Sequence, residues 1–177
     1  MNDLTLPSDW FCAGSHPKHY IMGIDPDIRQ GGLRTALICS RGADAEGFGT
    51  LMQSCLPGEY SGRRVRLSAM ARTEEVREWG GLWFRVDGPT SGESLSFDNM
   101  QDRPLQGTSD WKRYSVVLDV PDMAVAMAYG VLLAGAGRVW ISDVHFEKVG
   151  EDVPSTDLRA SRFTNRPSYP RNLDFSR

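Results

Sequence analysis

The chain has 177 residues and a formal net charge of −3, with 40% hydrophobic and 24% charged residues. This length suits one domain with its own core, and the charge gives no general attraction to nucleic acid or to an anionic membrane surface. No apolar run approaches the roughly 20 residues that span a bilayer, and the N-terminal stretch lacks the basic and apolar regions of a signal peptide. These features predict a cytoplasmic protein with neither nucleic-acid nor membrane partners.

Three cysteines, Cys12, Cys39 and Cys55, cannot all pair with one another, and their spacing matches no metal or redox motif. We expect free thiols in or near the core, as in a protein of a reducing compartment. The sequence also carries no GxSxG, phosphate-loop or dinucleotide fingerprint. No cofactor is therefore predicted from motifs.

Short segments of alternating apolar and polar residues, separated by turn-forming clusters, recur along most of the chain. This pattern is typical of an all-β sandwich or barrel, and the long connections favour a jelly roll. One stretch, TEEVREW (73–79), is expected to form a single helical turn. We predict an all-β jelly-roll β-sandwich of two antiparallel sheets with an extended C-terminal arm. The predicted strands are 19–24, 33–40, 48–54, 63–71, 81–87, 94–98, 112–120, 125–134 and 138–148.

The composition changes after residue 149, which divides the chain into a jelly roll (1–149) and an Arg- and Pro-containing tail (150–177). From residue 158 to the end, five arginines accompany one aspartate. Such a segment is either a disordered appendage or an arm that docks on its own sandwich or, by exchange, on a second copy to give a homodimer. The docked arm is favoured by four spaced apolar anchors, Phe163, Tyr169, Leu173 and Phe175.

The strand 81–87 places a mixed set of side chains opposite its core-facing residues. Trp83, Arg85 and Asp87 alternate with three apolar residues, so they share one face of the strand. Asp98, in the second arm of the hairpin, is expected to lie across from part of that row. An aromatic face beside hydrogen-bonding charged groups suits a sugar or another planar polar ligand, whereas the plainer interpretation is a solvated Arg–Asp pair.

The loop FDNMQDRP (97–104) adds further polar candidates at the end of a strand. Asn99 and Gln101 are predicted to bind ligand with Gln53, which ends a neighbouring strand. Asp98 and Asp102 are the candidate catalytic acids if the protein is an enzyme, and a turn held by Asx hydrogen bonds is the structural alternative. The remaining tryptophans are assigned to structure: Trp79 and Trp111 as loop plugs over the sandwich ends, and Trp140 as a packing residue.

Five stretches together resemble the carbohydrate-binding-module type of jelly roll, within the galactose-binding-domain-like folds. They are GFGTLMQ (47–53), GRRVRLSAMART (62–73), WFRVDG (83–88), GTSDWKRYSVVLDVP (107–121) and VWISDVHFEKV (139–149). The resemblance covers about residues 10–149 and implies the same sandwich and a saccharide-like ligand. It also implies a candidate structural calcium ligand at Asp143 in the last strand, with Asp3 and Asp9 as the nearby N-terminal acids.

Three functions fit these observations. The leading hypothesis is a β-sandwich that binds a small polar ligand such as a saccharide and has no catalytic machinery of its own. The second is a small jelly-roll enzyme, a cyclase, isomerase or lyase, that uses Asp98 or Asp102. The third is an effector-sensing or interaction domain of a larger regulator.

Overall fold

The structure is a computed structural model that describes residues 4–159, and within this part the secondary structure is almost entirely β. Asp3 and the predicted anchors between residues 163 and 175 lie outside the described residues. The described strands are β1 (Phe11–Gly14), β2 (Tyr20–Gln30), β3 (Leu33–Ser40), β4 (Phe48–Cys55), β5 (Arg63–Asp87), β6 (Ser94–Asp98), β7 (Leu105–Val120), β8 (Ala126–Ala134) and β9 (Arg138–Val149). Two short 3-10 helices, η1 (Pro17–His19) and η2 (Gly58–Tyr60), accompany them.

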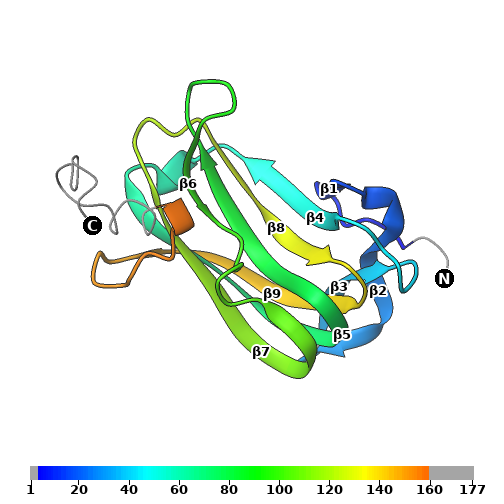
Figure 1. The fold of residues 1–177 in the computed structure, drawn as a ribbon. Helices are drawn as coiled ribbons and strands as arrows, with labels where there is room; N and C mark the ends of the chain where they lie inside the picture. Colours follow the sequence, from blue (N-terminus) through cyan, green and yellow to red (C-terminus); the bar gives the residue numbers. More distant parts are fainter. Residues whose placement is uncertain (1–3, 160–177) are drawn as a thin grey trace, which may run out of the picture.

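The long strand β5 belongs to both layers of the sandwich (Figure 1). Its first half, residues 63–74, pairs with β7 and β9, and β3 and β2 follow β9 in the order of strands. Its second half, residues 79–87, pairs with β6 and β8, followed by β4 and β1. We call the first layer the back sheet and the second the groove sheet. All pairings are antiparallel, and the predicted jelly-roll β-sandwich is confirmed.

The core lies between the two sheets and follows the predicted alternation. Leu82, Phe84 and Val86 of the groove sheet are each no more than 1% exposed. They belong to the same buried cluster as Val65 and Leu67 of the back sheet. The inward faces of β5 are therefore apolar in both sheets, as expected when two antiparallel sheets pack face to face.

The helical turn predicted for residues 73–79 is wrong, because this stretch continues β5. Its register against β7 shifts three times, and Glu75 has a positive φ of 51°, so the strand bends as it passes from one sheet to the other. Val76 is 3% exposed in the core, and the N–H of Arg77 donates to the carbonyl of Ala136. Backbone groups of this stretch thus form hydrogen bonds with neighbouring strands, whereas in a helical turn they would form them within the turn.

Residues 151–157, which we call the strap, continue past β9 and lie on the open edge of the sandwich. Thr156 and Val117 of β7 exchange hydrogen bonds, from Thr156 N to Val117 O at 2.8 Å and from Val117 N to Thr156 Oγ1 at 2.9 Å. The carboxylate of Asp157 accepts the N–H of Phe97 on β6 at 3.1 Å. Because β6 and β7 each pair only with β5 among the described strands, the strap covers both free edges.

All three cysteines are free; Cys39 is buried as expected, whereas Cys12 and Cys55 are exposed rather than in the core. Among residues 4–159, no helix is both long and apolar enough to cross a membrane.

Candidate functional site

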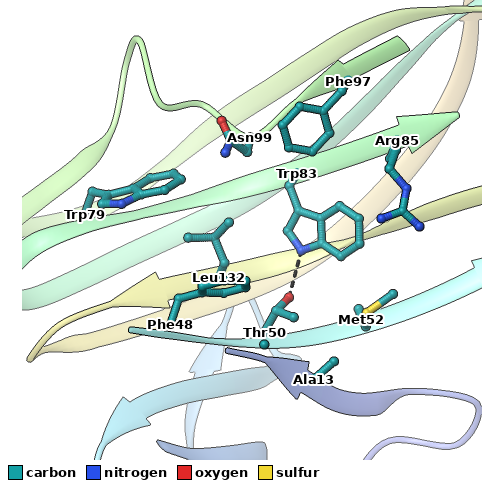
Figure 2. Close-up of a pocket in the computed structure, with 11 residues that line it drawn as sticks. Ala13, Phe48, Thr50, Met52, Trp79, Trp83, Arg85, Phe97, Asn99 and Leu132 are labelled. Atoms are coloured by element: carbon teal, nitrogen blue, oxygen red, sulfur yellow. Dashed lines mark hydrogen bonds between the residues drawn. The ribbon is translucent and has the colours of Figure 1, made fainter. Parts of the chain in front are cut away.

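A groove of about 400 Å³ lies on the outer face of the groove sheet (Figure 2). This volume falls in the range of small-molecule binding sites. Most of its lining is apolar or aromatic, with Arg85 as its charged side chain. The lining residues are Ala13, Gly14, Phe48, Thr50, Met52, Trp79, Trp83, Arg85, Phe97, Asn99 and Leu132.

Trp83 forms the middle of the groove and is held in one orientation. Its indole N–H donates to the hydroxyl of Thr50 at 2.7 Å, and that hydroxyl donates to the carbonyl of Val131 at 2.8 Å. Trp83 and Thr50 are both buried. Since the indole has one hydrogen-bond donor and no acceptor, Trp83 can offer a ligand only its carbon surface.

Gly130 occupies the position on β8 that pairs with Trp83. In the register of β5, β8 and β4, Gly130 lies between Trp83 and Met52. A Cβ atom at this position would come within 2.2 Å of the carbonyl oxygen of Leu51. The absence of a side chain at Gly130 therefore allows the backbones of β8 and β4 to approach closely at this point.

The aromatic side chains lie along the groove, with the charged group at one end. Figure 2 shows Trp79, Trp83 and Arg85 in sequence along β5, with Phe97 of β6 above Trp83. Trp83 packs in one outer apolar cluster with Trp79 and Phe97. Aromatic surfaces next to a hydrogen-bonding cation match a ligand with an apolar face and a polar edge.

Arg85 forms the polar end of the groove and pairs with Asp87. The Nε and Nη2 groups of Arg85 donate to the two carboxylate oxygens of Asp87 at 2.6 and 3.0 Å. Both residues also line a second hollow of about 310 Å³, closed by the hairpin loop of residues 88–94. Arg85 lines both hollows, so a ligand in either one would lie next to this residue.

Asp98 does not lie with Arg85, contrary to the sequence-based expectation. The register pairs Asp98 with Phe84 and Phe97 with Arg85. The side chain of Asp98 therefore lies on the core side of the sheet, like Phe84, and the side chain of Phe97 lies on the groove side, like Arg85. Asp98 is fully buried and accepts hydrogen bonds from the Arg103 guanidinium at 2.6 and 3.2 Å and from the N–H of Met100 at 2.8 Å. These contacts satisfy the carboxylate and make it a structural group of the loop.

The other loop candidates divide between the groove and the surface. Asn99 lines the groove and also accepts the N–H of Gln101 in an Asx turn. Gln101 is exposed, and the exposed Asp102 pairs with Arg103 at 2.8 Å; neither is a lining residue. The structure therefore brings Asn99 together with Trp83 and Arg85, but not the two proposed acids.

Among Gln53 and the other three predicted tryptophans, only Trp79 lines the groove. Gln53 accepts a hydrogen bond from Tyr129, away from the groove lining. Trp79 lies on β5 and lines the groove rather than plugging a loop. Trp111 lies on β7 and packs, half-buried, against the outer cluster of the back sheet. That cluster contains Trp140, which is buried as predicted.

Sequence reasoning missed Phe48, Thr50, Met52, Phe97 and Leu132 as lining residues. A signal for three of them exists, because Thr50, Met52 and Leu132 lie at outward positions of β4 and β8, where an exposed sheet would carry more polar side chains. Apolar residues on both faces of a strand indicate that the outer face is also covered or binds something.

The surroundings of Asp143 do not suit a calcium ion. Its carboxylate pairs with the guanidinium of Arg113 and lies 2.7 Å from Nε2 of His145. The hydrogen bond with His145, together with the one from Arg113, lowers the pKa of Asp143 below its ordinary value. Calcium takes six to eight oxygen ligands, and no group of three His, Cys, Asp or Glu residues that could hold a metal occurs within residues 4–159.

The sandwich has the same fold as several solved structures, among them carbohydrate-binding β-sandwich modules. The xylan-binding domain CBM22-1 of Paenibacillus barcinonensis Xyn10C superposes with a TM-score of 0.58 at 12% identity, over 82% of this chain and 88% of that one. A family 30 carbohydrate-binding module superposes at 0.56 and 12%, over 84% and 96%. The enzymatically active domain of bacteriophage CBA120 tailspike protein 4 gives 0.61 and 13%, over 80% of this chain and 20% of that one. The chain has the fold of these proteins.

The chain also has a relative that is similar in sequence. The chain is 42% identical over 150 residues to the uncharacterized HTH-type transcriptional regulator YbfP of Bacillus subtilis strain 168. The matched part is 84% of this chain and 50% of the regulator, so the chain spans half the length of this curated relative. No protein-family model matches the sequence.

Proposed function

We propose that the protein is a ligand-binding β-sandwich that holds a small polyhydroxylated molecule, such as a saccharide, in the groove of the groove sheet. The observation that carries the proposal is the fixed Trp83 indole between Trp79 and the Arg85–Asp87 pair. The carbon face of a sugar ring would stack on the aromatic surface, and its hydroxyl groups would meet the charged pair. Similarity in fold to saccharide-binding modules supports the same ligand class.

The lining favours binding over acid–base catalysis. Arg85 is the charged residue of the main hollow, and a guanidinium has hydrogen-bond donors but no acceptor. Asp98 is buried on the opposite side of β6, and Asp102 pairs with Arg103 at the surface. A general acid or base must come within hydrogen-bonding reach of the substrate, which these positions do not provide for a ligand in the groove.

Isothermal titration with xylotriose, cellotriose and β-1,4-galactotriose, preceded by a glycan array, tests the proposal. We expect saturable binding that weakens at least about tenfold in Arg85→Ala and in Trp79→Ala, because a hot-spot contact is worth about 2 kcal/mol. Trp111→Ala is the matched control, since Trp111 is also half-buried on an outer face but belongs to the back sheet. Absence of binding to every glycan would contradict the proposal, as would equal effects of all three variants.

A second candidate function is effector sensing within a transcriptional regulator in the cytoplasm. It is favoured by the similarity to YbfP and by the strap, whose Asp157 binds the backbone of the groove residue Phe97. In this case, saturating ligand should slow hydrogen exchange at the amides of Thr156 and Phe97. A pure binding module would leave these amides unchanged. The strap also suggests that the folded unit extends beyond the boundary expected at residue 149, at least to Asp157.

A further inference from the structure

The Arg85–Asp87 pair leaves a specific set of hydrogen-bonding groups available to a ligand. Asp87 occupies the Nε and Nη2 side of the guanidinium, and within residues 4–159 the Nη1 group has no hydrogen-bond partner. The side chains of Arg85 and Asp87 remain 42% and 26% exposed. A ligand at this end of the groove therefore meets N–H donors and carboxylate acceptors next to each other.

The charge balance at this end is negative. Arg85, Asp87 and Glu93 are the charged side chains that line the second hollow, and Asp87 already neutralises Arg85. The Glu93 carboxylate accepts the N–H of Thr90 at 3.3 Å and adds a further negative charge. Any anionic group placed here would approach two carboxylates and one guanidinium that is already paired.

A hydroxyl group complements this arrangement better than a carboxylate or phosphate does. A hydroxyl can donate to Asp87 and accept from Arg85 at the same time, whereas an ionised acid has acceptors only. Like charges brought together in a partly desolvated site are unfavourable. Taken with the proposed function, on which this step rests, we propose that the groove selects neutral polyhydroxylated ligands over anionic ones, and that Asp87 is the residue that determines this selection.

The selection is measured with two ligands that differ only at C6, cellotriose with its neutral hydroxymethyl groups and its oxidised counterpart with carboxylates in their place. We expect wild-type protein to bind cellotriose at least about tenfold more tightly than the oxidised form. Asp87→Asn keeps the size of the side chain and removes its charge, so the guanidinium becomes available to an acid. In this variant we expect the preference for cellotriose to fall to about threefold or less, or to reverse in favour of the oxidised form.

Asp27→Asn is the control, because it changes the net charge equally at an exposed position on β2 of the back sheet. It should leave the ratio of the two affinities unchanged. Tighter or equal binding of the oxidised form to wild-type protein overturns the inference but leaves the proposed ligand-binding function intact. An unchanged ratio in folded Asp87→Asn removes Asp87 as the determinant. If neither form, nor any other glycan, binds, the proposed function fails and the inference fails with it.

Discussion

The indole nitrogen of Trp83 lies 2.7 Å from the hydroxyl oxygen of Thr50, and this hydrogen bond crosses the intervening strand β8. The bond links β5 to β4, which are not neighbours in the sheet. It fixes the aromatic surface on which the proposed function depends. The position of the indole in the groove therefore depends on one buried hydroxyl.

Thr50→Val should destabilise the protein and weaken ligand binding together. Valine has the shape of threonine but leaves the buried indole N–H without an acceptor, which costs about 1–3 kcal/mol. Trp83→Phe removes the donor, so Thr50→Val should cost less in that background. A double-mutant cycle by urea denaturation measures the difference. Equal costs of Thr50→Val in both backgrounds would show that the hydrogen bond does not contribute.

The buried Asp98 is expected to stabilise the loop that borders the groove. Asp98→Asn weakens its bonds with Arg103 and should lower the free energy of unfolding by about 2–3 kcal/mol. Asp102→Asn is the control, because the carboxylate of Asp102 also binds Arg103 but is 59% exposed; its loss should cost less than about 1 kcal/mol. Urea denaturation of both variants checks the order. A larger cost for Asp102→Asn would contradict this assignment.

The misplacement of Asp98 shows what alternation alone could not predict. The prediction of which β5 residues face the core was correct, because apolar residues such as Leu82 alternate with outward-facing residues such as Trp83 along the strand. The register of its partner depends on a β-bulge: Asp87 pairs with Ser94, but Val86 pairs with Ser96. Continuing the first pairing without the bulge would have set Asp98 opposite Trp83, on the groove face. One extra residue exchanges the two faces of a strand, and thereby places Phe97 in the groove.

The rest of the groove could not be predicted for a related reason. Phe48, Thr50 and Leu132 come from strands that are distant along the chain and meet β5 only through the topology of the sheet. The alternating pattern identifies which residues face outward, but it does not identify which strands are neighbours. The fold class was therefore predictable, along with the Trp83–Arg85 row, while the opposite wall of the groove was not.

Asp25 should make the stability of the back sheet depend on pH. Burial opposes ionisation of Asp25, but hydrogen bonds from the Trp140 indole and from the backbone N–H groups of Ile28 and Asp27 outweigh it, and the pKa is lowered. In the unfolded chain this carboxyl titrates near its ordinary value of about 3.9. Between the two pKa values the unfolded chain binds a proton that the folded protein does not. The contribution of ionised Asp25 to the free energy of unfolding is therefore complete above about pH 5. It is lost as the pH falls through the pKa of Asp25 in the folded protein.

Comparison of wild-type protein with Asp25→Asn isolates this contribution. The difference in free energy of unfolding should be largest above about pH 5 and should shrink as the pH falls below about 3.9. Denaturant titrations at several pH values measure it. Asp27→Asn, which retains the backbone N–H that binds Asp25, serves as the control. A difference that grows toward acid pH would contradict the lowered pKa.

The strap should contribute measurably to stability, because it is fastened at several points. In addition to the bonds of Thr156 and Asp157, the Arg64 guanidinium donates to the carbonyls of Glu151 and Val153 at 2.9 and 2.8 Å. Each such bond contributes about 0.5–1.5 kcal/mol net, and ordering the segment offsets part of this sum. A chain ending at Gly150 should therefore lose about 1–2 kcal/mol, which corresponds to a fall in Tm of about 2–8 °C. A second chain ending at Arg159 retains the strap and separates its effect from that of residues 160–177. Equal Tm values for the two truncated chains would show that the strap adds nothing to the stability.

The chain ending at Arg159 also tests whether the tail docks. If Phe163, Tyr169, Leu173 and Phe175 dock on the sandwich or on a second copy, this chain should have a lower Tm or an altered oligomeric state relative to the full chain, because the buried apolar contacts of these side chains would be lost.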